Sequence, residues 1–124
     1  MSAVELYSYA ACPFAQRTRM VLAEKAIDHE LLEVDLANRP DNWNEISPTG
    51  TVPLLRHDGA TIYESTIINQ YLDDTIVDLP LMPATALGRA QARIWMDHCY
   101  HRFLVTIHNL MRQRDNAEKL TDDA

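Results

Sequence analysis

The fold is decided in Val4–Arg19, where the sequence reads VELYSYAACPFAQRTR. Apolar and polar side chains alternate through Val4–Ser8, and this period of two predicts a short strand. From Pro13 the apolar residues return at helical spacing, which predicts a helix that ends near Ala26. Proline suits the first position of a helix because its missing N–H would have no partner there. The stretch therefore predicts a strand that leads through a short loop into a helix.

A second strand is predicted over His29–Leu36. Strand, helix and strand in succession imply a parallel pair of strands with a right-handed crossover. Asp41–Ile46 is predicted to form at most a short helix. Ser47–Pro53, which contains two prolines and a glycine, is predicted to be a loop.

The strongest local signal is a β-hairpin. Two β-prone runs, Pro53–His57 and Ala60–Tyr63, flank Asp58-Gly59, which favours a two-residue hairpin turn. Ser65 can cap a further helix that runs through Leu72. The predicted order is β-α-β followed by β-β-α, which makes this an α/β chain.

A linker with two prolines, Thr75–Pro83, separates these elements from a single long helix predicted over Leu87–Arg114. The polar residues Asp115–Ala124 are expected to be frayed. The long helix carries two apolar stripes, so one supporting surface would not cover it. The stripes are Leu87, Ala90, Ile94, Leu104 and Met111, and Trp95, Cys99, Phe103 and Leu110.

Composition and charge exclude several classes of protein. The 124 residues suffice for about one domain, and the net charge of −7, without a cluster of basic residues, argues against direct binding of nucleic acid. The first residues lack the pattern of a signal peptide, and no apolar run is long enough to span a membrane. We therefore expect a soluble cytoplasmic protein with no membrane partner.

Metal binding is not expected. Two cysteines, Cys12 and Cys99, are too few for a disulfide framework and too isolated for a zinc site. On the long helix, only His98 and His101 are spaced to lie together, since His108 is further along. Any chemistry of the cysteines is therefore thiol chemistry.

Cys12 stands directly before a helix that follows a strand, where unpaired helical N–H groups lower the pKa of a thiol. Arg17 and Arg19 could add positive potential, although Arg17 could equally point to solvent. The alternative for Cys12 is a small buried residue, which is also how we interpret Cys99. Ala15 stands where a Cys-x-x-Cys motif has its second thiol, so Cys12 must use an external thiol, most simply glutathione.

Four motifs in order resemble the N-terminal domain of cytosolic glutathione transferases, most closely the omega class. The motifs are Tyr7-Ser8, Cys12-Pro13-Phe14-Ala15-Gln16-Arg17-Thr18-Arg19, Thr51-Val52-Pro53-Leu54-Leu55 and Tyr63-Glu64-Ser65. The resemblance covers about Val4 to Asp74, and Leu81-Met82-Pro83 with the long helix resembles the opening of that family's helical second domain. It implies a thioredoxin-like glutathione-binding domain over residues 1–78, and a linker and the start of the helical domain over 79–124.

The resemblance implies that Cys12 is the catalytic thiol. Tyr7 and Tyr9 could be taken for the activating hydroxyl of other classes, but with Cys12 present we interpret them as packing residues. It also implies a cis bond between Val52 and Pro53, which frees the backbone of Val52 to pair with glutathione like an added strand. The alternative for Pro53 is an ordinary proline at the start of a strand.

The same resemblance implies how glutathione would be held at its two ends. Glu64 would pair with the ammonium of the γ-glutamyl end, while Ser65 and the helix N–H groups take its carboxylate. Arg39 falls where the omega pattern has a lysine near the glycyl carboxylate, or it is a solvated loop charge. Phe14 completes the implied glutathione site, and Ser65 could serve only as a helix cap.

We therefore expect an omega-like enzyme that carries out glutathione-dependent thiol transfer or reduction through the Cys12 thiolate, with glutathione as co-substrate and a small electrophilic or oxidised second substrate. The alternatives are a non-catalytic regulator resembling stringent starvation protein A, and a glutathione-dependent isomerase or dehalogenase. Family members usually continue through further helices that form most of the pocket for the second substrate, so that pocket is in doubt here. The two apolar stripes favour a homo-oligomer, expected to be a dimer.

Overall fold

The computed structural model describes residues 3–122. They divide into two compact units, unit 1 ending at Met82 and unit 2 beginning at Pro83. Unit 1 contains β1 (Val4–Ser8), α1 (Pro13–Glu24), β2 (Glu30–Glu33), α2 (Trp43–Ile46), β3 (Leu54–His57), β4 (Ala60–Tyr63) and α3 (Ser65–Thr75). Unit 2 contains α4 (Ala86–His98), a π-helical segment η1 (Cys99–Leu104) and α5 (Val105–Asp122).

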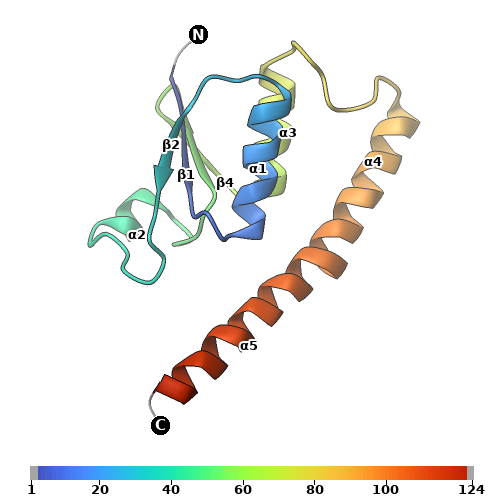
Figure 1. Ribbon diagram of the computed structural model, residues 1–124. Helices are drawn as coiled ribbons and strands as arrows, with labels where there is room; N and C mark the ends of the chain where they lie inside the picture. Colours follow the sequence, from blue (N-terminus) through green and yellow to red (C-terminus); the bar gives the residue numbers. More distant parts are fainter. Residues whose placement is uncertain (1–2, 123–124) are drawn as a thin grey trace. The chain divides into compact units, whose positions relative to one another are not determined.

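Unit 1 is built on a four-stranded sheet in the order β2-β1-β3-β4 (Figure 1). The strand β1 pairs with β2 in parallel and with β3 antiparallel, and β3 and β4 form the predicted hairpin. The turn residues Asp58 and Gly59 both have positive φ, which is the conformation that an Asp-Gly hairpin turn requires. This arrangement is a thioredoxin-like fold, so the predicted fold class is confirmed.

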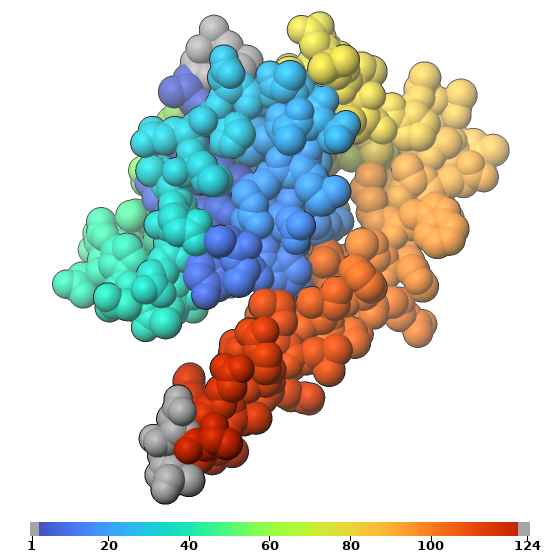
Figure 2. Space-filling model, viewed as in Figure 1, coloured from blue at the N-terminus to red at the C-terminus, as the bar shows by residue number. Residues whose placement is uncertain are grey.

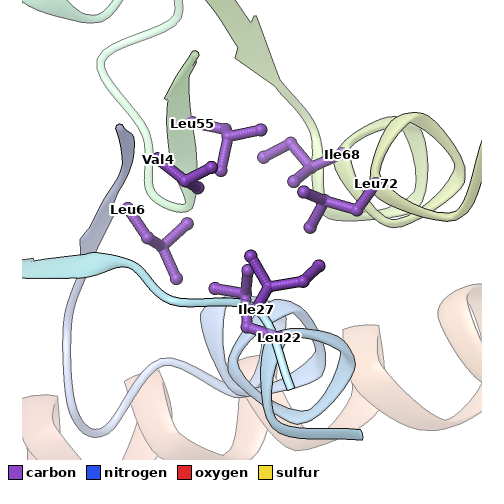
Figure 3. Packing of buried hydrophobic residues seen from close by; sticks show 7 residues of the cluster. All are labelled: Val4, Leu6, Leu22, Ile27, Leu55, Ile68 and Leu72. Carbon is purple, nitrogen blue, oxygen red and sulfur yellow. The ribbon is translucent and has the colours of Figure 1, made fainter. Parts of the chain in front are cut away.

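The main core lies between the sheet and the two helices α1 and α3, which Figure 1 shows on one side of the sheet. Val4 and Leu6 point into it because alternate residues of a strand share a face. Each large aliphatic side chain buried here contributes about 1.5–3 kcal/mol. Figure 3 shows the seven buried residues directed towards one another: Val4, Leu6, Leu22, Ile27, Leu55, Ile68 and Leu72.

A second, smaller core lies around Trp43 of α2, together with Val34 and Val52. Tyr7 packs against this cluster, because odd-numbered residues of β1 face away from the main core. Cys12 also packs against it. The smaller core therefore links β1, the loop before β3 and the start of α1.

Two elements are shorter than the sequence predicts. The strand β2 covers Glu30–Glu33 rather than His29–Leu36, because Asp35 turns the chain: its carboxylate accepts a hydrogen bond from Ala37 N–H at 3.0 Å. The short helix α2 starts at Trp43, with Asn42 before it, rather than at Asp41.

Unit 2 is a single run of helix from α4 through η1 to α5, which is coloured orange to red in Figure 2. Thr85 caps its start, since the Thr85 hydroxyl accepts a hydrogen bond from Gly88 N–H at 3.0 Å. In η1 the helix widens, and Val105 N–H bonds to Tyr100 O, five residues back. This wider turn breaks the regular spacing on which the two predicted stripes depend.

The prediction that Asp115–Ala124 is frayed is wrong for Asp115–Asp122, which continue α5. Polar side chains keep a helix out of the core but do not prevent it from forming, and this segment has no proline or glycine. Arg114 also pairs with Glu118 one turn later, at 4.0 Å. The last two residues, 123 and 124, lie outside the described part of the chain.

In the described residues, no helix is both long enough and apolar enough to cross a bilayer.

A buried ion pair connects α1, α3 and the segment at the end of unit 1. Lys25 Nζ lies 2.9 Å from Asp73 Oδ1, with the two side chains 0% and 8% exposed. The ammonium also donates to the carbonyls of Asp78 and Leu79, at 3.1 and 3.2 Å. Asp73 therefore neutralises a charge that would otherwise be buried alone.

The Asp73 carboxylate also holds the residues that lead into unit 2. It accepts hydrogen bonds from Leu81 N–H at 2.8 Å and Met82 N–H at 3.1 Å. Burial alone would raise the pKa of Asp73, but these two N–H groups and the ammonium of Lys25 hold it below its ordinary value of 3.8. Residues 79–82 belong to unit 1, whereas the predicted boundary lies after residue 78.

We predict that Lys25→Met lowers the free energy of unfolding by about 3–5 kcal/mol, because Asp73 is left as an uncompensated buried charge. Urea unfolding at pH 7 measures this. The exposed Lys119→Met is the matched control, for which we expect a change under about 0.5 kcal/mol.

The same ion pair makes the stability of unit 1 depend on pH in the acid range. Because the pKa of Asp73 is lowered in the folded state, its contribution to stability is complete above pH 3.8 and is lost as the pH falls below that value. Asp73→Asn should therefore be less stable at pH 7 but lose less further stability between pH 5 and pH 3. Equal acid dependence of the variant and the wild type would contradict this account.

Candidate functional site

Cys12 is the N-cap residue of α1, and Pro13 follows it at the first helical position. Cys12 has the extended backbone of an N-cap, with φ −78° and ψ 116°, and its Sγ accepts a hydrogen bond from Ala15 N–H at 3.5 Å. The side chain is half-buried. The sulfur thus lies at the positive end of the helix dipole and remains partly accessible.

The loop before β3 reaches Cys12 from far along the sequence. Cys12 Sγ lies 4.0 Å from the carbonyl oxygen of Val52, within reach of a weak S–H hydrogen bond. The bond between Val52 and Pro53 is cis, as the resemblance implies, and both residues are buried. The structure therefore brings two of the predicted motifs, Cys12-Pro13 and Val52-Pro53, into contact.

The third motif, Glu64-Ser65, stands at the start of α3. Glu64 is exposed and has φ +72°, a conformation that is rare for residues other than glycine and that often marks a functional position. Ser65 is buried and is the first residue of the helix. The prediction that Ser65 caps α3 is therefore wrong: Glu64 holds the N-cap position, without a side-chain hydrogen bond to the helix.

Arg17 links α1 to the start of α3. Its Nη1 donates to Ser65 Oγ and to Thr66 Oγ1, both at 3.2 Å. The expectation that Arg17 could simply point to solvent is therefore wrong. A guanidinium beside the N-terminus of α3 adds positive charge where the helix dipole already favours an anion.

Arg39 fixes the loop that leads to Val52. Its Nη1 donates to the carbonyl of Gly50 at 3.1 Å, and its Nε donates to Leu36 O at 3.4 Å. The indole N–H of Trp43 bonds to the same Gly50 carbonyl at 3.0 Å. This role of Trp43 was not predicted from the sequence, although a tryptophan in a polar segment usually finds a partner for its N–H when it is buried.

Of the remaining residues singled out from the sequence, Phe14 is half-buried in the first turn of α1, next to Cys12 in the chain. Tyr7 and Tyr9 pack against the smaller core, and the Tyr7 ring lies 5.7 Å from that of Trp43. Cys99 is half-buried in η1. Among residues 3–122, no three His, Cys, Asp or Glu side chains are grouped so that they could hold a metal ion.

The site thus combines a thiol at a helix start, a backbone carbonyl beside it, and a second helix start carrying Glu64, Ser65 and the guanidinium of Arg17. A thiol of this kind can attack sulfur or an electrophilic carbon. The N-terminus of α3 can hold a carboxylate, and Glu64 can hold an ammonium.

Comparison with known proteins identifies the family. The family model for the glutathione S-transferase N-terminal domain matches residues 6–77. A probable glutathione transferase of Aplysia californica is 42% identical over 87 residues, which are 70% of this chain and 95% of that protein. Glutathione S-transferase omega-2 of Rattus norvegicus is 37% identical over 95 residues, 76% of this chain and 38% of that protein.

A solved structure supports the same assignment. The crystal structure of rice GST1 in complex with glutathione has a TM-score of 0.75 and 34% identity, and the match covers 81% of this chain and 48% of that one. The chain thus spans most of the Aplysia protein but under half of the rat protein and of the rice structure. Because the family model covers more than half of the chain, and its relatives include omega enzymes, the chain belongs to the cytosolic glutathione transferase family, close to the omega class.

Proposed function

We propose that this chain binds glutathione and transfers thiols through Cys12. The observation that carries the proposal is the position of Cys12 Sγ, which accepts Ala15 N–H at the start of α1 and lies 4.0 Å from the carbonyl of Val52. With Ala15 in place of a second cysteine, Cys12 acts as a single thiol. A cytoplasmic location suits this chemistry, because glutathione keeps that compartment reducing.

The reaction proceeds by two thiol–disulfide exchanges. The Cys12 thiolate attacks the glutathione sulfur of a mixed disulfide, so that a disulfide between Cys12 and glutathione forms and the substrate leaves as a thiolate, which takes up a proton. A second glutathione thiolate then attacks the glutathione sulfur of that disulfide. Oxidised glutathione is released and the Cys12 thiolate is regenerated, so that the electrons balance.

Glutathione would lie across the three motifs. Its cysteinyl unit would pair with the backbone of Val52 beside Pro53, which brings its sulfur to Cys12. Its γ-glutamyl end would bind at the start of α3, with its ammonium on Glu64 and its carboxylate on Ser65 and the helix N–H groups. Phe14 would contact the tripeptide next to Cys12. Arg39 would give up its hydrogen bond to the Gly50 carbonyl and bind the glycyl carboxylate instead. The rice relative was solved in complex with glutathione, which supports glutathione as the ligand by similarity.

We predict that Cys12→Ser lowers the rate of glutathione-dependent reduction of a small mixed disulfide at least about 100-fold, because the hydroxyl is a poor nucleophile at neutral pH. A coupled spectrophotometric assay measures the rate, and calorimetric titration measures glutathione affinity, which should stay within about threefold. The Cys99→Ser variant is the matched control and should keep full activity.

Three results would count against the proposal. A wild-type chain that binds no glutathione would favour the non-catalytic regulator, and a Cys12→Ser variant that is fully active would exclude thiol transfer through this residue. Turnover of a haloalkane or an isomerisable substrate, without disulfide reduction, would favour the dehalogenase or isomerase alternative instead.

We predict that Glu64→Gln weakens glutathione binding about tenfold, since a charge-assisted hydrogen bond to the ammonium becomes a neutral one. Calorimetric titration at pH 7 measures the affinity. Glu24→Gln, an exposed carboxylate at the end of α1, is the control and should leave binding unchanged. Equal affinities for both variants would remove Glu64 from the proposed site.

We also propose that the chain forms a homodimer through unit 2. Unit 2 leaves several large apolar side chains exposed, and Trp95 alone is 72% exposed. Large apolar side chains that a helix leaves exposed are candidates for burial against a second copy. The exposed residues are Leu87, Ile94, Trp95, Phe103, Leu110 and Leu120.

For this dimer we predict that sedimentation velocity at micromolar concentration gives one species of twice the chain mass. Trp95→Glu should shift the population towards monomer, because a buried charge at the interface would be unpaired. Gln91→Glu, an exposed polar position on the same helix, should not. A wild-type chain that sediments only as a monomer would contradict the dimer.

A further inference from the structure

The loop Tyr9–Ala11 follows β1 and leads to Cys12, the residue directly before α1. It has little apolar packing of its own, because Ala10 and Ala11 are exposed and only Tyr9 packs against the smaller core. A loop without buried side chains moves unless hydrogen bonds hold it. The position of Cys12 therefore depends on polar contacts made by neighbouring elements.

Arg19 of α1 supplies three of these contacts. Its Nη1 donates to Ser8 Oγ at 2.5 Å and to the carbonyl of Tyr9 at 3.2 Å, and its Nη2 donates to the carbonyl of Ala10 at 3.1 Å. Ser8 is fully buried and Arg19 is half-buried, so the bonds to Ser8 and Tyr9 are partly sheltered from water, whereas the bond to the Ala10 carbonyl is exposed. A single guanidinium thus bonds to three consecutive residues that lead towards Cys12.

Glu33 at the end of β2 bonds to the same loop. Its Oε1 accepts a hydrogen bond from Ala10 N–H at 2.7 Å. The next residue, Val34, donates its N–H to the carbonyl of Ser8, also at 2.7 Å. Ala10 is therefore bonded through its carbonyl to Arg19 and through its N–H to Glu33.

One acceptor connects these contacts to the thiol. The carbonyl of Tyr9 accepts a hydrogen bond from Cys12 N–H at 2.9 Å as well as from Arg19. Fixing this carbonyl fixes the backbone of Cys12, and with it the direction of Sγ towards Ala15 N–H. If the carbonyl moves, Sγ loses its alignment with the helix start that stabilises the thiolate.

We propose that Arg19 and Glu33 are positioning residues for Cys12, which hold the loop so that Sγ stays at the N-terminus of α1. The importance of this role for thiol transfer rests on the proposed function, but the effect on the thiol itself does not. Arginine suits the position because its planar fork donates several bonds in fixed directions, whereas lysine cannot reproduce them. At position 33 any side-chain oxygen can accept from Ala10 N–H, so glutamine can replace glutamate.

The test measures the reactivity of Cys12 without glutathione. The rate of alkylation by iodoacetamide is followed between pH 5 and pH 10 by peptide mass spectrometry, with Cys99 in the same sample as an internal reference. The variants are Arg19→Lys, Glu33→Ala and Glu33→Gln, and Arg93→Lys on the exposed surface of α4 is the matched control. Thermal unfolding shows that each variant is folded at the assay temperature.

We expect Arg19→Lys and Glu33→Ala to slow alkylation of Cys12 about fivefold at pH 7, which corresponds to the loss of about one ordinary hydrogen bond that holds the loop. The pH at which the rate is half-maximal should rise in both variants, while the rate at high pH and the rate of Cys99 stay the same. Glu33→Gln and Arg93→Lys should match the wild type within about twofold.

The proposal is overturned if Arg19→Lys and Glu33→Ala both keep the wild-type pH profile, or if the profile of Glu33→Gln shifts as far as that of Glu33→Ala. If either Arg19→Lys or Glu33→Ala does not fold, the pH profile of the other variant still tests the proposal. Failure of the proposed function looks different: the wild type would then bind no glutathione, whatever the alkylation rates. A shifted profile in a chain that binds no glutathione would support the positioning role and exclude the reaction.

Discussion

The contact on which the candidate site depends is the one between the start of α1 and the loop before β3, where Cys12 Sγ lies between Ala15 N–H and the carbonyl of Val52. The main core holds α1 in place through its buried residues, while the smaller core holds Val52 next to Trp43. Cys12 itself packs against the smaller core. The thiol is therefore fixed by both cores at once, and a change in either would move it relative to the backbone that it faces.

Much of unit 1 could be predicted because its signals are local. The alternation in β1, the Cys12-Pro13 helix start and the Asp58-Gly59 turn each act within a few residues, and all three appear in the structure. The helical structure of Asp115–Asp122 could not be predicted from its polar side chains, because polarity indicates exposure to solvent rather than the absence of a helix. The π-helical turn in η1 was missed because no residue type marks such a turn.

In the candidate site, too, the candidate functional residues could be predicted from the sequence, but the residues that hold them could not. Cys12, Val52, Pro53, Glu64 and Ser65 stand out in the sequence by type and order, and the structure places Cys12 beside Val52 and Ser65 beside Arg17. The partners that hold these residues come from distant positions, so spacing alone does not reveal them. Arg17 bonds across to α3, and Trp43 and Arg39 share the Gly50 carbonyl.

The central claim is that Cys12 exchanges disulfides with glutathione. The most direct measurement is to incubate the chain with oxidised glutathione at pH 7 and map the modified cysteine by peptide mass spectrometry. The account predicts one glutathione attached at Cys12, removed again by reduced glutathione, with Cys99 unmodified. An adduct confined to Cys99, or no adduct at Cys12, would contradict it.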